Sequence, residues 1–90
     1  MEHFTKIKEK IAIGNTKEAI KELNDLINKN PNDANLYYLK GNAYRKENDW
    51  KNAMECYLEA KNIDAESPAA QTLTMMTDIL NFYNKDIYNQ

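Results

Sequence analysis

The chain has 90 residues, of which 42% are hydrophobic and 29% charged, and its 12 basic and 14 acidic residues give a net charge of −2. This length indicates one small domain, and the mild acidity excludes a strongly basic nucleic-acid-binding protein. The single cysteine excludes an intrachain disulfide framework, and the single histidine excludes a His-rich metal site. No apolar run approaches the roughly 18 residues that a membrane span needs.

The N-terminal stretch lacks the continuous apolar segment of a secretory signal. Lys6, Lys8 and Lys10 interrupt every apolar run there. We therefore expect a cytoplasmic protein, and the lone Cys56 fits a reducing compartment.

Apolar residues recur at helical spacing along the chain and predict helices throughout. The first helix is expected over roughly residues 2–13. The second begins at Asn15 or Thr16, where Glu18 is placed to complete a capping box, and runs to about Asn28. The apolar faces of these two helices are formed by Phe4, Ile7, Ile11, Ala19, Leu23, Leu26 and Ile27.

Turn-forming residues separate the next two helices. Pro31, which cannot continue a helix, ends the second one, and Asp33 is expected to cap the third. The third helix stops near Asn48, and Asp49 can cap the fourth. The buried candidates are Leu36, Tyr37, Leu39, Ala43 and Tyr44 in the third helix, and Trp50, Ala53, Met54, Tyr57 and Ala60 in the fourth.

A fifth helix starts at the pair Ser67 and Pro68, a capping hydroxyl followed by proline at the first helical position. It is expected to run to about Tyr83. One of its sides carries Leu73, Met76, Ile79, Leu80 and Tyr83. Because no useful strand-like alternation is present and the connections are short, the sequence predicts an all-α fold of about five helices.

Residues 14–33 are similar to residues 48–67 when the two segments are aligned at an offset of 34. The aligned pairs are Gly14 with Asn48, Asn15 with Asp49, Lys17 with Lys51, Ala19 with Ala53, Leu23 with Tyr57, and Leu26 with Ala60. Two unrelated helices rarely share small and large positions at one period, so the chain is expected to contain an internal repeat.

A helix–turn–helix unit of this period is that of the tetratricopeptide repeat, and the segment from Ala34 to Ser67 resembles that family closely. The matching positions are Tyr37, Gly41 and Tyr44 in its first helix and Ala53, Tyr57 and Ala60 in its second. Lys40 and Ala65 depart from the family pattern, which usually has an apolar residue and a proline there.

The resemblance implies a right-handed α-α superhelix of antiparallel helix pairs. Its expected parts are a first repeat over about 1–33, a second over about 34–67, and a capping helix and tail over 68–90. The first helix of the first repeat is degenerate. An offset of 33 aligns its apolar residues better, which predicts a connection one residue shorter around Gly14.

In this family the first helix of each pair lines the inner face of the superhelix. For the second repeat, the resemblance implies a peptide- or protein-binding face made by Asn35, Tyr38, Asn42, Arg45 and Lys46. An asparagine can hydrogen-bond an extended backbone, the cations can meet carboxylates, and a tyrosine suits an interface. In the first helix the corresponding set is Thr5, Glu9 and Ala12, or Phe4, Lys8 and Ile11 in the other register. The chaperone-binding carboxylate clamp of the family is not present.

We therefore expect a non-catalytic adaptor that binds an unidentified protein or peptide and has no cofactor, no metal, and no nucleic-acid or membrane ligand. The alternative is a self-assembling helical module, a homodimer through the C-terminal helix. This alternative rests on a second apolar side of that helix, with Met75, Ile79, Phe82 and Ile87. An enzyme would need a constellation that is missing, since Cys56 has no base near it in the sequence.

Overall fold

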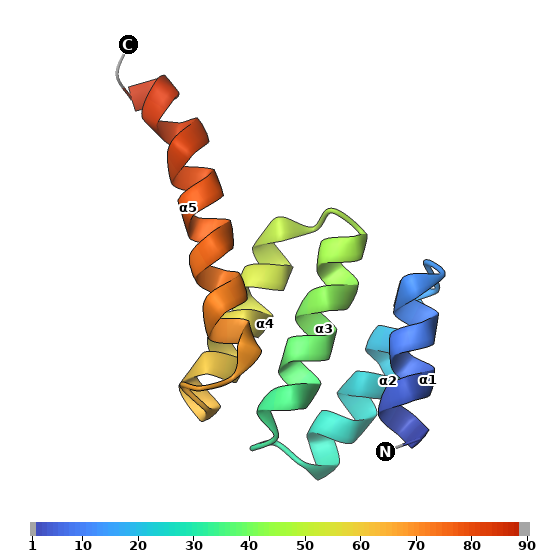
Figure 1. The fold of residues 1–90 in the computed structure, drawn as a ribbon. Helices are drawn as coiled ribbons and strands as arrows, with labels where there is room; N and C mark the ends of the chain where they lie inside the picture. The colour runs from blue at the N-terminus through green and yellow to red at the C-terminus, as the bar shows by residue number, and fades with distance from the viewer. Residues whose placement is uncertain (1, 89–90) are drawn as a thin grey trace.

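The computed structural model describes the backbone of residues 2–88 and the side chains of residues 4–80, and within this part the chain is all-α. Its helices are α1 (Glu2–Ala12), α2 (Thr16–Lys29), α3 (Ala34–Lys46), α4 (Trp50–Ile63) and α5 (Pro68–Tyr88). Successive helices run antiparallel and stack into a right-handed superhelix (Figure 1). The fold class predicted from the sequence is confirmed.

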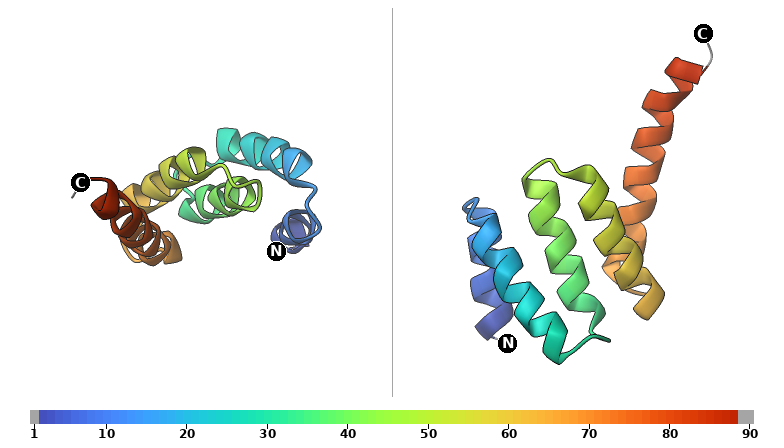
Figure 2. Two further views of the ribbon diagram at one scale, coloured as in Figure 1. Left: turned by 90° about the horizontal axis from the view of Figure 1, so that it is seen from above. Right: turned by 180° about the vertical axis from the view of Figure 1, so that it is seen from behind.

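The helices form two layers. Seen from above in Figure 2, α1, α3 and α5 lie on one side of the molecule, and α2 and α4 lie on the other. α3 is central, because it packs on α1, α2 and α4, whereas α5 packs on α4. The inner, concave side of the array is therefore built from the first helix of each pair.

Short polar side chains cap three of the helices, as the sequence predicts. The Asp33 carboxylate accepts a hydrogen bond from the Asn35 amide at 3.0 Å, and Asp49 accepts one from the Asn52 amide at 3.3 Å. At α5 the Ser67 hydroxyl accepts from the Ala69 amide at 3.2 Å. Each acceptor satisfies a backbone N–H that the first helical turn leaves without a partner.

The cap expected at α2 has another geometry. Asn15 is the N-cap residue, but its side chain makes no capping bond to the backbone. Its amide Nδ2 instead donates to Glu18 Oε2 at 2.8 Å, so the predicted capping box is replaced by a bond between the two side chains.

The connections repeat at an offset of 34, bond for bond. Between α1 and α2 the backbone amides of residues 13, 14 and 15 donate to the carbonyls of residues 9, 11 and 10. Between α3 and α4 the amides of residues 47, 48 and 49 donate to those of residues 43, 45 and 44. Both connections therefore have the same length, and the prediction of a shorter one around Gly14 is wrong.

Left-handed backbone explains how the two connections match. Gly14 has φ 89° and its equivalent Asn48 has φ 64°. Glycine and asparagine are the residues that adopt this conformation most readily, so the same turn is made by two different residue types.

Two apolar clusters hold the helices together. The first joins α1, α2 and α3 around Ile7, Leu23 and Leu36, and the second joins α3, α4 and α5 around Tyr57 and Met76. Small residues allow close packing in the second cluster, where Ala53, Ala60 and Ala69 are fully buried. Tyr37 and Tyr44, expected to be buried, are half-buried.

Two features of the C-terminal half differ from expectation. α5 continues to Tyr88 rather than ending near Tyr83, because no glycine or proline interrupts residues 69–88. Trp50, expected in the core, is 43% exposed. The equivalent residue of α2, Thr16, is buried and donates a hydrogen bond to Glu47, which lies in the α3–α4 connection of the next repeat. Trp50 has no such connection beside it, because α5 continues as a helix at the corresponding residues.

α5 itself presents a partly apolar outer surface. Ile79, expected to face the core with Met76, is 49% exposed, whereas Met76 is buried. None of the helices, as far as the structure describes them, combines the length and the hydropathy of a membrane span.

Candidate functional site: the groove between α1 and α3

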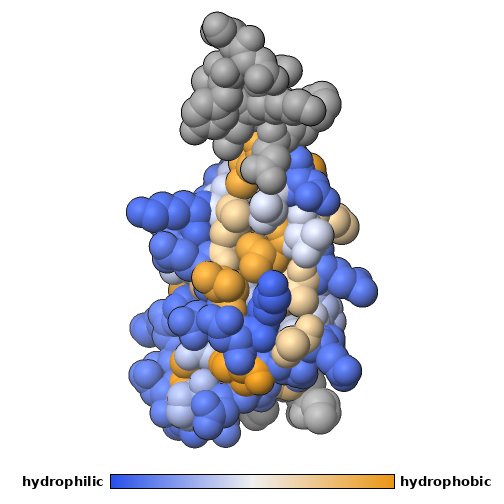
Figure 3. Space-filling model, turned by 90° about the vertical axis from the view of Figure 1, so that its left-hand side faces the viewer, coloured by the Kyte–Doolittle hydropathy of each residue, from blue (hydrophilic) through white to orange (hydrophobic). Residues whose placement is uncertain are grey.

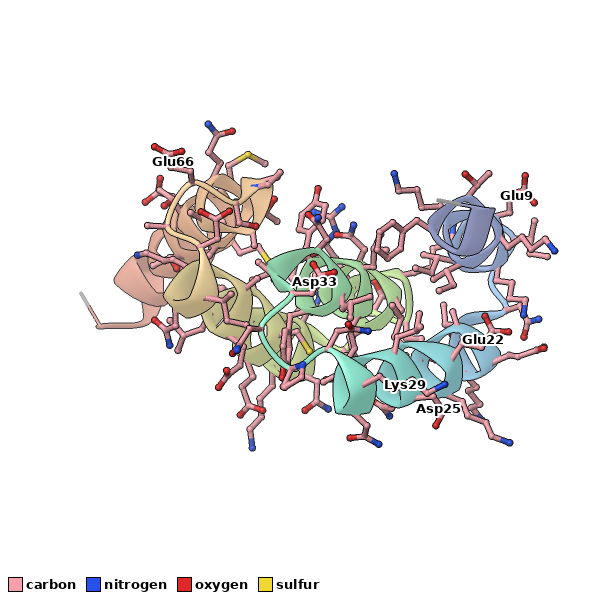
Figure 4. All side chains as sticks on the ribbon, turned by 90° about the horizontal axis from the view of Figure 1, so that it is seen from below. Glu9, Glu22, Asp25, Lys29, Asp33 and Glu66 are labelled. Atoms are coloured by element: carbon pink, nitrogen blue, oxygen red, sulfur yellow. The ribbon has the colours of Figure 1, made fainter. Side chains whose placement is uncertain are left out.

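A groove of about 520 Å³ opens on the concave side of the molecule, between the C-terminal halves of α1 and α3. Its walls are formed by Lys8, Ile11 and Ala12 from α1 and by Asn42, Arg45 and Lys46 from α3, with Asn48 following. Figure 4, seen from below, shows the two helices on either side of this space and Glu9 pointing away from α3.

The two walls use the same positions of two consecutive repeats. Lys8 and Asn42, Ile11 and Arg45, and Ala12 and Lys46 are pairs separated by the period of 34. Because the connections have equal length, the helices present these positions to the same side. The groove is thus a direct product of the repeat.

The floor of the groove is tied to the core of the second repeat. The Tyr57 hydroxyl donates a hydrogen bond to Asn42 Oδ1. This bond orients the Asn42 amide and leaves its Nδ2 hydrogens available to a ligand. Burial raises the pKa of Tyr57 to about 12, although the positive charge of Arg45 favours ionisation. The phenol is therefore a neutral donor at neutral pH.

The groove is electrostatically one-sided. Lys8, Arg45 and Lys46 line it, and no carboxylate from the described side chains does. Among residues 4–80 the ion pairs are those of Lys10 with Glu18 and Glu22, on another side of α1, so none of the three groove cations is paired. Ile11 and Ala12 add an apolar strip on the α1 wall. The surface offers cations, amide donors and aliphatic carbon to a ligand.

The structure brings together three of the five predicted site residues. Asn42, Arg45 and Lys46 share the groove. Tyr38 is half-buried instead, with its ring centroid 5.9 Å from that of Tyr57, and it packs against the core cluster of α3, α4 and α5. Asn35 lies at the other end of α3, where it lines a separate hollow beside Pro31 and Asp64.

The α1 wall follows the offset of 34. Lys8 and Ile11 come from the set predicted for that offset, and Ala12, predicted in the other set, lines the groove as the equivalent of Lys46. Asn48 was not anticipated as a groove residue. The alignment of Asn48 with Gly14 could have indicated this position. It places Asn48 in the turn directly after α3, and such a turn borders a groove formed by the last residues of α1 and α3.

Outside the groove the described residues offer little chemistry. Cys56 is buried, and burial raises the pKa of its thiol to about 11, which keeps it protonated and unreactive. No cluster of three or more His, Cys, Asp or Glu side chains suited to a metal occurs among the described residues.

The stacked helix pairs and their concave groove define an α-helical repeat domain. The tetratricopeptide repeat family matches residues 10–75, and this chain belongs to that family. Among solved structures, the solution NMR structure of Bacteroides fragilis protein BF1650 is similar, with 44% sequence identity and a TM-score of 0.86. The match covers 100% of this chain and 92% of that one. No curated protein matches the sequence.

Proposed function

We propose that this chain is a protein-interaction adaptor that holds a segment of a partner protein in the groove between α1 and α3. Members of this repeat family generally mediate protein–protein interaction. The observation that carries the proposal is the gathering of three cations, none of them in an ion pair with another described residue, around an oriented amide on the concave face. The proposed role is binding alone, without a chemical step.

The side chains of the groove suit an extended polypeptide. Asn42 Nδ2 can donate to a backbone carbonyl, since its Oδ1 already accepts from Tyr57. Arg45 can form two parallel hydrogen bonds with a carboxylate, and Lys46 adds a flexible point charge beside it. These contacts combine main-chain recognition with recognition of acidic side chains.

Affinity capture from the source cells tests the proposal. The double variant Arg45→Glu/Lys46→Glu reverses the groove charge and should lose the partner. The control Lys17→Glu/Lys51→Glu makes the same change in net charge at two exposed, equivalent positions of α2 and α4. Retention of the same partners by both double variants would contradict the proposal.

We propose homodimerisation through α5 as a second candidate function. Met75 and Ile79 are 59% and 49% exposed, and Figure 3 shows apolar side chains gathered on the face of the molecule that carries α5. Phe82 and Ile87, which complete the stripe in the sequence, lie outside the described side chains. Sedimentation equilibrium tests this candidate: a dimer that becomes a monomer in Ile79→Lys supports it, and a monomer at all concentrations removes it.

A further inference from the structure

The groove is asymmetric across its width. At the level of the connections the α1 wall is apolar, with Ile11 and Ala12, and the facing α3 wall is cationic, with Arg45 and Lys46. Ile11 is only 9% exposed, so it forms the base of a shallow apolar seat that the exposed Ala12 side chain borders. A ligand that crosses from α1 to α3 meets aliphatic carbon first and positive charge next.

The distance between the two walls sets a spacing along the ligand. Packed helices lie about 8–10 Å apart, axis to axis. An extended chain advances about 3.3 Å per residue, so about three residues span the step from one helix to the next. Because α1 and α3 pack on each other, we take this usual separation for the two walls, so that an aliphatic side chain seated at Ile11 places the residue about three positions away near Arg45.

The charge of that residue follows from the donor set. The α3 wall offers the Arg45 guanidinium, the Lys46 ammonium and the free Nδ2 hydrogens of Asn42, all of them donors. Among the described residues the lining has no carboxylate to pair with a ligand cation, whereas a ligand carboxylate would find two cations. The α3 wall therefore favours a hydrogen-bond acceptor of the ligand, and the α1 wall favours an aliphatic side chain.

We propose, on the basis of the proposed function above, that the groove recognises an extended segment with an aliphatic residue and an acidic residue three positions apart. The aliphatic side chain rests on Ile11 and Ala12, and the carboxylate binds Arg45 and Lys46. Lys8, one turn earlier on α1, attracts acidic segments in general without contributing to the spacing.

A peptide partner is favoured over a nucleic acid by the same surface. Among residues 4–80 the groove lining holds three cations and no aromatic side chain. Binding of single-stranded nucleic acid combines a charged groove with aromatic stacking platforms. Tyr38 and Tyr57 pack against each other with ring centroids 5.9 Å apart, and Tyr44, next to Arg45 in the sequence, is half-buried against the α3–α4 core cluster.

Titration of the isotopically labelled full chain with synthetic peptides tests the proposal. The probe is a Gly/Ser octapeptide with a leucine and, three positions later, a glutamate, used with a peptide of reversed order. The control peptide has the same composition with the leucine and glutamate adjacent. A spaced peptide, in either order, should bind about tenfold more tightly than the adjacent one, which corresponds to one lost anchor. It should shift the amide resonances around Arg45.

Variants of the protein test which groove residues bind the glutamate and which bind the leucine of the peptide. Arg45→Gln should reduce the preference for glutamate over glutamine in the spaced peptide, and Arg45→Gln/Lys46→Gln should abolish it. Lys8→Gln should weaken every acidic peptide while preserving the preference for the spaced one. Ala12→Asp should remove the leucine contribution. Each variant changes an exposed side chain, and an unchanged amide spectrum elsewhere verifies that it folds.

Equal affinities for spaced and adjacent peptides would overturn the inference, as would tighter binding of a deoxythymidine oligonucleotide at the same amides. If partner capture still depends on Arg45 and Lys46 in that case, the proposed function stands and only the sequence pattern is wrong. If capture is also insensitive to these residues, the proposed function fails as well.

Discussion

The Tyr57 ring of α4 fills the space that a side chain at Gly41 of α3 would occupy. A Cβ atom placed on Gly41 would lie 2.6 Å from Cε1 and 2.7 Å from Cδ1 of the Tyr57 ring. The ring is fully buried, and its hydroxyl bonds to Asn42 at the floor of the groove. The small residue in one helix and the aromatic one in the other therefore fix both the helix spacing and the shape of the candidate site.

Gly41→Ala should destabilise the protein by about 1–3 kcal/mol, because overpacking forces a buried ring or a helix to shift. In thermal denaturation this corresponds to a fall in Tm of roughly 4–8 °C per kcal/mol for a domain of this size. Tyr57→Leu in the same chain should relieve the clash, so that the two changes are not additive. An unaltered Tm in Gly41→Ala would show that the helices do not approach as closely as described.

The left-handed turns give a second prediction. Gly14→Ala should lower stability by about 1–2 kcal/mol, since alanine adopts positive φ poorly. No atom lies within 4 Å of the new Cβ position, so only the backbone conformation is responsible. Gly14→Asn should be milder, because Asn48 makes the equivalent turn at φ 64°. Chemical denaturation of the two variants measures the difference, and equal losses would contradict this explanation.

The helices and the period of 34 could be predicted because both are encoded locally. Caps at Asp33, Asp49 and Ser67 and the apolar spacing between them fix where helices begin. The predicted register of α1 is wrong because it aligns apolar residues with apolar residues. In the correct register the equivalent of Ile11 is Arg45, an exposed groove residue. The pattern of apolar side chains favours an offset of 33, whereas the matching backbone hydrogen bonds of the two connections fix the offset at 34.

The candidate site was only partly predictable for a related reason. Helical periodicity identifies a face, but it does not say where along that face a hollow forms. Asn35 lies on α3 at the end where the α2–α3 and α4–α5 connections meet, and Arg45 lies at the end beside α1. Tyr38 turned inward because the neighbouring Tyr57 ring provides an aromatic partner, a contact between helices that spacing within one helix cannot reveal.

Alkaline pH should destabilise the protein by ionising two buried side chains, Tyr57 and Cys56. Burial raises the pKa of Tyr57 from 10.0 to about 12 and that of Cys56 from 9.0 to about 11. Both groups are neutral in the fold and ionise earlier in the unfolded chain. Their contribution is complete below the unfolded pKa values and is lost as pH rises through the folded ones.

Circular dichroism between about pH 9 and pH 12 measures this loss of stability. In a Cys56→Ala background the fall above about pH 10 should be smaller when Tyr57→Phe is added, because the phenol no longer titrates. Burial also raises the pKa of Tyr44, which is present in both proteins and therefore cancels in the comparison. Identical pH profiles would assign the loss to other groups.

Groove variants should separate binding from folding. Arg45→Gln and Lys46→Gln replace exposed side chains without ion pairs, so each should change the free energy of unfolding by less than about 0.5 kcal/mol. Binding of the captured partner should weaken in both, and its dependence on salt concentration should decrease, because fewer charged contacts remain to be screened. Calorimetry at two salt concentrations checks both effects, and an unchanged salt dependence would place the partner elsewhere.

Site-specific photo-crosslinking in the source cells tests the central claim most directly. A photoreactive amino acid at Ala12 projects into the groove, and one at Asn24 lies exposed on α2, in the outer layer. A groove that holds the partner yields a crosslinked partner from position 12 and none from position 24. Crosslinks from position 24 alone, or the same partner from both positions with equal yield, would contradict the assignment of the concave groove as the binding site.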